Sequence, residues 1–344
     1  MAVTIYDVAQ HAGVALSTVS RVINNSGYVK QETRNKVYEA IKILNYVPSS
    51  VARTLSTNES NNIAVIIPDI TNPFFSEVIK GITKELDTTE FDLIFYNTNE
   101  NIQKEYRALQ AIIKNRVRGL IITPIAEMVQ ENKNLLKQNQ EMGIPIVLVD
   151  RDIHGLNCDG VFVDNVTGSF EATKLLLNES HRRIAIIHGP LTSIPGKDRL
   201  KGYLDAYQAV NIQPARSLQY VGNFMFESGV SATRKILKAK KRPTAIFCCN
   251  NLMTMGCMAA LKENHMKIPD DMAVVGFDEL SVYDIISSPI TIVSRATTEM
   301  GSLAVHTLLR RIRHPGDQPK HPNRIILQPH LEIRGSEKLI SKAD

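Results

Sequence analysis

From residue 63 onward, hydrophobic residues occur in short continuous runs that are separated by amphipathic stretches. The nine runs are IAVIIP from Ile63, FDLIFYN from Phe91, GLIITP from Gly119, PIVLVD from Pro145, GVFVD from Gly160, RIAIIHG from Arg183, AIFCCN from Ala245, MAVVGFD from Met272 and ITIVS from Ile290. Continuous runs are typical of strands covered on both faces, whereas the stretches at 75–86, 104–115, 168–178 and 251–265 have helical periodicity. The alternation predicts parallel sheets with right-handed crossovers, and this number of strands fits two sheets better than one.

The segment before residue 63 contains no strand-like run. It shows three short helical patterns, followed by the polar stretch STNESNN, which is typical of an exposed connector. A domain boundary is therefore expected near residues 57–61. After His314, the stretch PGDQPKHPN predicts a surface loop that leads to a last strand-like segment, HLEIRGS, and to a frayed tail beyond about residue 338.

The three N-terminal helices are predicted to share a small core. Thr4, followed three residues later by Asp7, marks the start of the first helix, and Gly13 marks its end. The second helix begins at Ser17, and the third extends over about 33–44. The inward-facing residues are Val8, Ala9, Ala12, Val19, Val22, Ile23, Val37, Ile41 and Leu44. Two short helices joined by a tight turn that contains glycine form a helix-turn-helix unit.

The second helix has a polar outer face. Its outward residues are Ser17, Thr18, Ser20, Arg21 and Asn24. Short hydroxyl and amide groups with one arginine suit phosphate oxygens and base edges in a major groove of DNA. The alternative is an ordinary solvated face on a three-helix bundle, and the helices alone leave both interpretations open.

The run TIYDVAQHAGVALSTVSRVINNSGYVKQETRNKVYEAIKILNYVPSSVARTLST resembles, over its whole length, the N-terminal signature of the LacI/GalR family of bacterial repressors. The segments VSRVIN, NYVP and VARTL carry the resemblance, and the body resembles the family as well. The resemblance implies a homodimer on pseudo-palindromic operator DNA, with each second helix in a major groove. It also implies that residues 49–55 fold into a hinge helix on DNA, where Leu55 wedges into the minor groove and kinks the duplex.

Matching positions to the family implies which residues face DNA. Leu16 and Ser17 fall where the family reads base identity, and Arg21 falls where it commonly contacts guanine. Residues expected mostly at phosphates or in the groove are Tyr6, Thr18, Asn24, Tyr28 and Arg53. The full set of candidate DNA-binding residues is Thr4, Tyr6, Leu16, Ser17, Thr18, Ser20, Arg21, Asn24, Tyr28, Ser49, Ala52, Arg53 and Leu55. Because Leu16 is apolar and can touch only a thymine methyl group or the backbone, the operator sequence stays open.

The body resembles periplasmic sugar-binding proteins, which have two doubly wound parallel-sheet lobes and a ligand between the carboxyl ends of their strands. The expected fold class is therefore an all-α helix-turn-helix headpiece plus an α/β body. Three parts are expected: a headpiece over 1–47, a hinge helix and linker over 48–60, and an effector-binding and dimerisation body over 61–340. The body is expected to have two lobes. The N-lobe covers about 61–160 plus 292–322, and the C-lobe covers about 161–291 plus 323–340.

Polar and aromatic residues lie at or just beyond the carboxyl ends of the predicted strands. The candidate effector-binding residues are Asn72, Phe74, Phe75, Asp150, Arg151, Arg199, Phe224, Asn250, Asp278 and Arg295. Carboxylates accept from two sugar hydroxyls at once, arginine donates in a bidentate manner, and aromatic rings meet the C–H face of a sugar. Each residue also has a structural alternative, since Asp150 could cap a helix and Phe74 could belong to the core. Together they predict a polar cleft for a small sugar or sugar phosphate.

Arg295 departs from the family's pattern. The family often has glutamine at this place in the stretch TIVSRATTEMG. Arginine adds a positive charge and further donors. It could sit in the pocket and favour a phosphorylated or carboxylated sugar, or it could turn aside into a salt bridge between the lobes.

Composition and charge limit the remaining possibilities. The net charge of +5 permits nucleic-acid binding without arguing for it. The four cysteines lack metal-ligand spacing and are expected to be reduced core thiols: Cys158, Cys248, Cys249 and Cys257. The chain start resembles no secretory signal, and no apolar run reaches the roughly 18 residues of a membrane span, so a cytoplasmic protein is expected. No cofactor or metal is expected.

The sequence favours a regulator over other classes of protein. It has no glycine-rich phosphate loop, no Gly-x-Ser-x-Gly elbow and no His/Cys cluster, and His188 is expected to end a strand. A transport binding protein is disfavoured by the headpiece. The prediction is a homodimeric repressor of a carbohydrate operon that a sugar-like effector releases from DNA. The alternative is a regulator activated by a phosphorylated phosphocarrier protein, which could dock on the basic stretch 310–313 unless that stretch is a solvated helix end.

Overall fold

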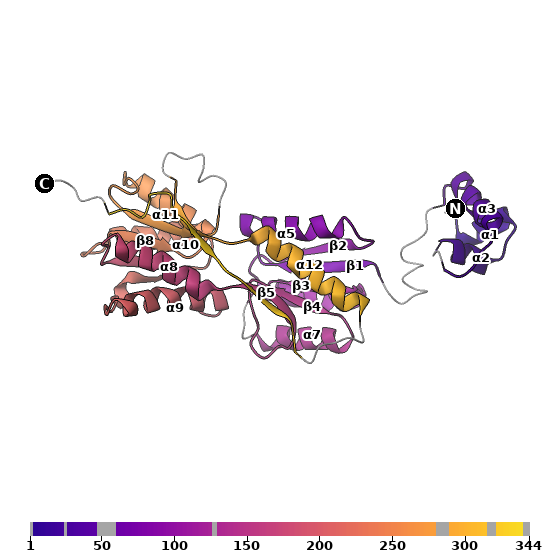
Figure 1. Cartoon of the computed structure of the whole chain (residues 1–344), viewed down its shortest axis with the longest axis horizontal. Helices are drawn as coiled ribbons and strands as arrows, with labels where there is room; N and C mark the ends of the chain where they lie inside the picture. The colour runs from indigo at the N-terminus through magenta and orange to yellow at the C-terminus, as the bar shows by residue number, and fades with distance from the viewer. Residues whose placement is uncertain are drawn as a thin grey trace. The chain divides into compact units, whose positions relative to one another are not determined.

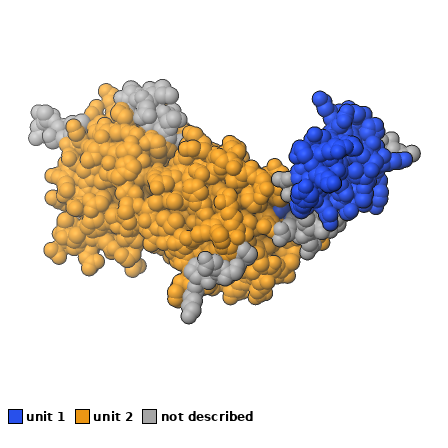
Figure 2. All heavy atoms as spheres, turned by 45° about the vertical axis from the view of Figure 1, so that its right-hand side comes forward, with its two compact units in different colours: residues 1–60 blue, residues 61–344 orange. Residues whose placement is uncertain are grey.

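A computed structural model describes residues 3–23, 26–46, 60–125, 129–279, 289–314 and 321–339 of the chain. The chain divides into two compact units, residues 1–60 and residues 61–344, which Figure 2 shows in separate colours. The first unit contains the headpiece, and the second is the body.

The headpiece is a bundle of three helices, α1 (Ile5–Ala12), α2 (Leu16–Ile23) and α3 (Gln31–Ile43). At the start of α1, the carboxylate of Asp7 accepts hydrogen bonds from the backbone N–H and the hydroxyl of Thr4, each at 2.7 Å. Gly13 ends α1 with a φ of 65°, a left-handed conformation that glycine adopts without steric cost. The predicted start and end of the first helix are thus confirmed.

The headpiece core is the one that the hydrophobic pattern predicts. The fully buried residues are Val8, Ala9, Val19, Val22, Val37 and Ala40, and Ala12, Ile23, Ile41 and Leu44 pack partly buried around them. Of the buried residues, Ala40 was absent from the prediction, as were some of the partly buried ones: Ile5, Val14, Leu16, Val29 and Tyr46. Leu16 also packs against this core, so part of its side chain is used for folding.

The body has two sheets of six strands each, shown in Figure 1. The first sheet, in the N-lobe, has the order β11-β5-β4-β3-β1-β2 and is parallel throughout. Its strands are β1 (Asn62–Ile67), β2 (Asp92–Asn97), β3 (Gly119–Ile122), β4 (Ile146–Val149), β5 (Asp159–Val163) and β11 (Arg324–Leu327). The two-lobed, parallel α/β architecture is the predicted fold class.

The second sheet, in the C-lobe, has the order β12-β10-β9-β8-β6-β7, and only β12 runs antiparallel to its neighbour. Its strands are β6 (Ile184–His188), β7 (Gln219–Val221), β8 (Ala245–Cys248), β9 (Ala273–Phe277), β10 (Thr291–Ser294) and β12 (His330–Glu332). The sequence pattern predicted all strands of the two sheets except β7 and β11. β7 has only three residues, and β11 has an incompletely buried edge position, so neither forms a buried apolar run.

Helices cover both faces of each sheet. The N-lobe helices are α5 (Pro73–Leu86), α6 (Ile102–Lys114), α7 (Gln130–Glu141) and α12 (Thr297–Arg313), and the C-lobe helices are α8 (Asn165–Asn178), α9 (Ile194–Ala209), α10 (Phe226–Leu237) and α11 (Asn251–Glu263), with a short 3-10 turn at Arg216–Leu218. In β1, Ile63, Val65 and Ile67 face the layer of α5 and α12, whereas Ala64 and Ile66 face the layer of α6 and α7. This division follows the two-residue period of a strand.

Two glycines let α5 and α12 pack side by side, as Figure 1 shows. A Cβ on Gly81 would lie 2.0 Å from the carbonyl oxygen of Thr298, and a Cβ on Gly301 would lie 2.1 Å from that of Val78. The backbones therefore touch, and any larger residue would force the helices apart. This contact fixes the start of α12, which follows directly on Arg295 and Ala296.

The chain crosses between the lobes after β5, after β10 and after β11, and these crossings correct the expected lobe boundaries. Residues 161–163 complete β5 in the N-lobe sheet, and residues 292–294 belong to β10 in the C-lobe sheet. Residues 324–327, expected in the C-lobe, pair with β5 of the N-lobe. The error arises because hydrophobicity shows that a segment is a strand but not which sheet it joins.

Candidate functional site

The predicted cleft residues gather at the carboxyl ends of strands from both lobes. Asp150 follows β4 of the N-lobe, and Asn250 and Asp278 follow β8 and β9 of the C-lobe. Asp150 and Asp278 have φ angles of 64° and 76°, in the left-handed region that few non-glycine residues adopt. The two aspartates thus share the same backbone conformation at equivalent strand ends of the two lobes.

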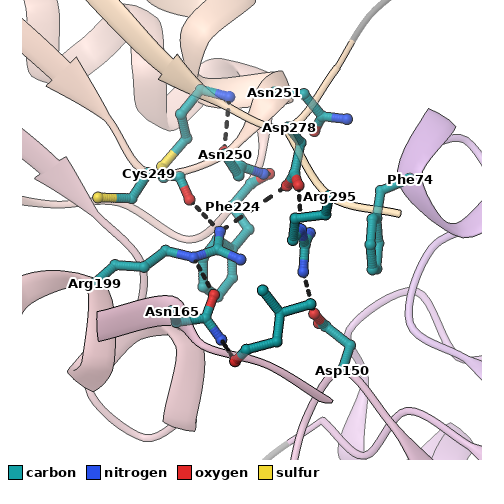
Figure 3. A network of polar contacts seen from close by, with 12 residues as sticks. Phe74, Asp150, Asn165, Arg199, Phe224, Cys249, Asn250, Asn251, Asp278 and Arg295 are labelled. Carbon is teal, nitrogen blue, oxygen red and sulfur yellow. Dashed lines mark hydrogen bonds and ion pairs between the residues drawn. The ribbon is translucent and has the colours of Figure 1, made fainter. Parts of the chain in front are cut away.

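All ten candidate effector-binding residues line one hollow between the lobes, together with Asp69, Glu100, Pro195 and Met225. The hollow measures about 420 Å³ when its open mouth is included, but the space left among the side chains for the centres of water molecules is only about 30 Å³. This is enough for a water molecule. Side chains therefore fill the middle of the cleft, as Figure 3 shows.

Arg295 occupies the centre of the cleft and binds a carboxylate of each lobe. Its Nη1 donates to Oδ1 of Asp150 at 2.5 Å, and its Nε donates to Oδ1 of Asp278 (Figure 3). The guanidinium also lies 3.9 Å from the ring centroid of Phe74. Side-chain exposure is 2% for Arg295, 7% for Asp150 and 5% for Asp278, so the three charges are shielded from solvent. The sequence left two places for the Arg295 side chain, the pocket or a salt bridge between the lobes. In the structure it lies in the pocket and also forms the salt bridge.

The pKa shifts agree with this pairing. Burial raises the pKa of Asp150, but the charges of Arg295, Arg199 and Arg151 lower it more, so the net pKa lies below its ordinary value. Burial lowers the pKa of Arg295, and the carboxylates of Asp278 and Asp150 more than offset this effect. Both groups are therefore held in their charged forms.

Arg199 is positioned by the C-lobe. Its Nε donates to Oδ1 of Asn165 at 2.8 Å, and its Nη1 donates to the carbonyl oxygen of Cys249 at 2.5 Å. Its nearest carboxylate oxygen, Oδ2 of Asp278, is 4.0 Å away, and its guanidinium stacks 3.7 Å from the ring centroid of Phe277. Burial and the neighbouring charge of Arg295 lower the pKa of Arg199 to about 10.

Arg151 is bound within the N-lobe. It makes a bidentate pair with Glu100, at 2.6 and 3.0 Å, and lies 5.4 Å from the ring centroid of Phe224 in the C-lobe. Phe224 itself has a φ of 67°, and its ring fills the space over Gly189, where a Cβ would come within 2.0 Å of it. The aromatic wall of the cleft is thus fixed by a close approach that requires glycine.

The two amide residues of the prediction also serve the scaffold. Oδ1 of Asn72 accepts from the backbone N–H of Phe74 at 3.0 Å and from Nδ2 of Asn251 in the other lobe at 2.9 Å. Asn250 caps α11 by accepting from the N–H of Met253 at 3.0 Å and donates to the carbonyl oxygen of Phe224 at 2.8 Å. Both amides line the hollow while they hold helix starts.

Two acidic lining residues were missed by the sequence interpretation. One carboxylate oxygen of Asp69 accepts from the N–H and hydroxyl of Thr71, and the other, Oδ2, is buried without a hydrogen-bond partner. Asp69 follows β1 just as Asp150 follows β4, so the same strand-end rule would have found it. Glu100 lies three residues beyond β2 and has no comparable signal. With them, the cleft holds four carboxylates and three guanidinium groups.

In the headpiece, the described candidate DNA-binding residues differ in exposure. Tyr6 and Tyr28 are 68% and 86% exposed, which is unusual for aromatic residues. Thr4, Ser17 and Arg21 are also exposed, whereas Leu16, Thr18 and Ser20 are half-buried. Asn24, Ser49, Ala52, Arg53 and Leu55, and with them the predicted hinge helix, lie outside the described residues.

Comparison with known proteins agrees with both parts of the chain. The family model described as bacterial regulatory proteins, lacI family, matches residues 4–49, and the model described as periplasmic binding proteins and sugar binding domain of LacI family matches residues 60–333. The chain belongs to the LacI family of bacterial transcriptional regulators. This LacI-family chain is therefore a DNA-binding transcriptional repressor with a body of the sugar-binding type.

Individual relatives cover nearly the whole LacI-family chain. The HTH-type transcriptional repressor PurR of Histophilus somni is 35% identical over 98% of this chain and 99% of its own, and the ribose operon repressor of Escherichia coli K12 is 34% identical over 97% and 99%. Among solved structures, the lac repressor dimer bound to operator and an anti-inducer superposes with a TM-score of 0.85 at 26% identity, covering 98% and 100%. These relatives are repressors, and none of these matches indicates an enzyme family.

The cysteines and His188 of this LacI-family regulator lie in the core of the body. The four cysteines are buried free thiols, and burial raises the pKa of Cys158 and of Cys249 to about 12. His188 ends β6, is buried, and has a pKa lowered by that burial. Within the described ranges, no group of three or more His, Cys, Asp or Glu residues could hold a metal ion. No described helix has the length and hydrophobicity of a membrane span.

The basic stretch 310–313 is the last turn of α12. Arg311 is committed to Asp159 through two hydrogen bonds of 2.6 and 2.7 Å, while Arg310 and Arg313 are exposed at the helix end. Cations at a helix carboxyl end are favoured by the helix dipole. The stretch thus has a structural explanation that needs no partner protein.

Proposed function

We propose that this LacI-family repressor acts as a homodimer on a pseudo-palindromic operator of a carbohydrate operon, and that a small sugar bound between the lobes releases it from DNA. The observation that carries the proposal is the convergence of all ten candidate residues on one interlobe hollow. Ligand sites of doubly wound folds lie at this edge of the sheets.

The chemistry of the hollow supports a polyhydroxylated ligand. Asp69 has one buried oxygen without a partner, which would accept a hydroxyl proton, and Asp150, Asp278 and Arg199 offer further acceptors and donors once the lobes adjust. Phe74 and Phe75 supply aromatic surface for a sugar's C–H face, with ring centroids 4.9 Å apart in an edge arrangement. Unpaired buried oxygens are costly in the free protein, so a hydroxyl that pairs with one is favoured.

The charge of the hollow favours a neutral sugar over a sugar phosphate. Four carboxylates outnumber three guanidinium groups among the lining residues. Arg151 is paired with Glu100, and Arg295 is paired with two aspartates, so neither offers a free positive charge. A phosphate group would meet net negative charge in a site shielded from solvent.

Some relatives of this chain have names that mention a sugar. Proteins similar to this chain include ribose operon repressors, at 32 to 34% identity, and the solved structure of the regulator CelR in complex with cellobiose, which has a TM-score of 0.73 at 30% identity over 97% of this chain. PurR relatives at 35% identity are equally close in sequence. The class of sugar therefore rests on the cleft rather than on the names of the relatives.

The headpiece supplies sequence recognition. In the proposed complex, α2 enters the major groove with Ser17 and Arg21 at the base edges, and Tyr6 and Tyr28 contact phosphates. By the family resemblance, the segment that contains Leu55 forms the minor-groove wedge. Binding of the sugar shifts the population of lobe arrangements, and this shift changes the geometry in which the two headpieces are held.

The proposal is tested with DNA that the protein selects from a random-sequence pool. Titration with neutral sugars should dissociate the selected operator, whereas the corresponding sugar phosphates should not. Dissociation by sugar phosphates alone would contradict the neutral-ligand part of the proposal. No response to any sugar, combined with capture of a phosphorylated phosphocarrier protein that tightens operator binding, would favour the alternative mode of control.

A further inference from the structure

Arg295 links the two lobes directly. It lies between β10 of the C-lobe and α12 of the N-lobe, at one of the three crossings of the chain. Its two carboxylate partners come from different lobes, since Asp150 follows β4 and Asp278 follows β9. We infer that Arg295 is an internal latch, which holds the lobes together in the ligand-free protein and which a sugar must displace to bind.

The latch, defined as the guanidinium of Arg295 with the carboxylates of Asp150 and Asp278, is complete only when the lobes are together. Each carboxylate belongs to one lobe, and each is less than a tenth exposed. Without Arg295, approach of the lobes would bury the two carboxylates with no cation bridging them, and Arg199, 4.0 Å from Asp278, would be the nearest guanidinium to that carboxylate. Burying unpaired like charges is strongly unfavourable. With glutamine, which the family often has at this position, closure of the two lobes would therefore depend on a ligand.

The other contacts between the lobes are weaker. One is a single amide hydrogen bond, from Nδ2 of Asn251 to Oδ1 of Asn72 at 2.9 Å. Another is the guanidinium of Arg151 at 5.4 Å from the ring centroid of Phe224. Neither joins opposite charges, whereas the guanidinium of Arg295 binds one carboxylate from each lobe. Among the described residues, the latch is therefore the strongest electrostatic link across the cleft.

The latch competes with a ligand for the same space. The cavity left among the side chains is about 30 Å³, which admits a water molecule and not a sugar ring. The guanidinium stands against the ring of Phe74, the surface on which a sugar would stack. A sugar must therefore move Arg295 aside and use its own hydroxyls as donors to Asp150 and Asp278. This displacement lowers the apparent affinity, because only the fraction of molecules with an open latch is competent to bind.

The inference rests on the proposed function only for the identity of the ligand, and a first experiment needs no ligand at all. Spin labels at Lys137→Cys on α7 and Gln208→Cys on α9 report the distance between the lobes, because both positions are exposed and the native cysteines are buried. Labelled protein is diluted with unlabelled protein, so that only distances within one chain are measured. Arg295→Gln should give a longer and broader distance distribution than the wild-type residue.

The matched control is Arg311→Gln. Arg311 forms a bidentate pair with Asp159, but both residues lie in the N-lobe, so its removal should leave the distance between the lobes unchanged. If Arg295→Gln reduces folding, as judged by circular dichroism and Tm, Arg295→Lys provides the same comparison with a smaller change. An ammonium group can serve only one of the two carboxylates closely, so an opening is still expected. Identical distances in wild type and both Arg295 variants would overturn the latch.

The second experiment uses D-ribose as the probe in calorimetric titrations. If Arg295 must be displaced, Arg295→Gln should bind D-ribose at least about tenfold more tightly than wild type. If Arg295 instead donates to the bound sugar, the variant should bind more weakly, which would overturn the competition. Failure of both proteins to bind D-ribose would show that the cleft is closed to this sugar even without Arg295, and would overturn the competition between Arg295 and the sugar.

Discussion

Arg295 and Asp150 are 145 positions apart in the chain, yet Nη1 of the arginine lies 2.5 Å from Oδ1 of the aspartate in the middle of the cleft. The arginine precedes a helix of the N-lobe and also binds Asp278 at the end of a C-lobe strand. The cleft that is proposed to sense a sugar is thus closed by the protein's own cation. This relationship explains why the site combines many charges with little net charge.

The pH dependence of stability should reveal the charged state of Asp150. Its pKa is lowered from the ordinary value of 3.8 in the folded protein, so its contribution to stability is complete above pH 3.8 and is lost as the pH falls through the lower folded value. Urea unfolding of the body between pH 2 and 7 measures this loss. Asp150→Asn should flatten the acid limb of the curve, and an unchanged acid limb would contradict the assignment.

The change of stability with pH that Glu105 causes should have the opposite sign to that of Asp150. Burial raises its pKa above the ordinary value of 4.5, and the hydrogen bonds from Asn132 and from the N–H of Ile125 only partly offset this effect. A raised folded pKa favours the folded state below pH 4.5, and this advantage is lost as the pH rises through the folded value. Glu105→Gln should therefore change the free energy of unfolding at pH 7 by less than about 1 kcal/mol, because Oδ1 of Asn132 has no partner and can accept from the new amide after a flip.

The neighbouring Glu100→Gln is the matched comparison for Glu105. Glu100 forms the bidentate pair with Arg151, whose side chain is 7% exposed. Removal of its charge would leave a buried guanidinium without its carboxylate partner and should cost roughly 2 kcal/mol, less than a fully buried pair because Glu100 is partly exposed. Equal losses in the two variants would contradict the different roles assigned to the two carboxylates.

Arg21 should contribute to operator selectivity. It is exposed on α2, so Arg21→Ala should leave the fold intact and reduce binding to the selected operator by about 1–3 kcal/mol, with a smaller effect on unrelated DNA. Fluorescence anisotropy at two salt concentrations separates this loss from the phosphate contribution. Lys36→Ala on α3, which removes an exposed partner of Glu32, serves as the control. Equal weakening on operator and unrelated DNA would assign Arg21 to phosphates.

Leu55 should matter only on the specific site. It lies outside the described residues, and its role follows from the family resemblance. An apolar wedge costs a few kcal/mol of base unstacking and is offset only where the bent duplex meets the dimer. Leu55→Ala should therefore weaken binding to the selected operator much more than binding to random DNA in the same anisotropy assay. Parallel loss on both would remove the wedge assignment.

The sequence predicted the layers of the fold well because continuous apolar runs and helical periodicity are local signals. It missed β7 and β11, which are short or lie at a sheet edge, and it misplaced the lobe crossings because pairing between strands is not local. The ten cleft residues could be grouped because strand ends of a parallel sheet share an edge. The partners of Arg295 could not be predicted, because its long side chain can reach either the pocket or the other lobe and the sequence does not distinguish these two orientations.

The headpiece also combines local features, which the sequence predicts, with features that depend on the partner DNA. Hydrophobic spacing identified its core, but Leu16 packs partly into that core although the family resemblance places it at the bases. A residue that serves folding and recognition together has no distinct sequence pattern. The hinge segment that contains Leu55 depends on the resemblance alone, because a short helix is marginal without its DNA and partner.

The interlobe cleft is proposed to control operator binding. The most direct measurement is the affinity for the selected operator with and without the neutral sugar that binds the body most tightly, in wild type and in Asp278→Ala. The sugar should weaken operator binding of the wild type by at least about fivefold, as expected for an allosteric coupling. It should cause no change in operator binding by Asp278→Ala, measured against that variant's own affinity without sugar. An unchanged wild-type affinity at saturating sugar, or an equal response in the variant, would contradict the account.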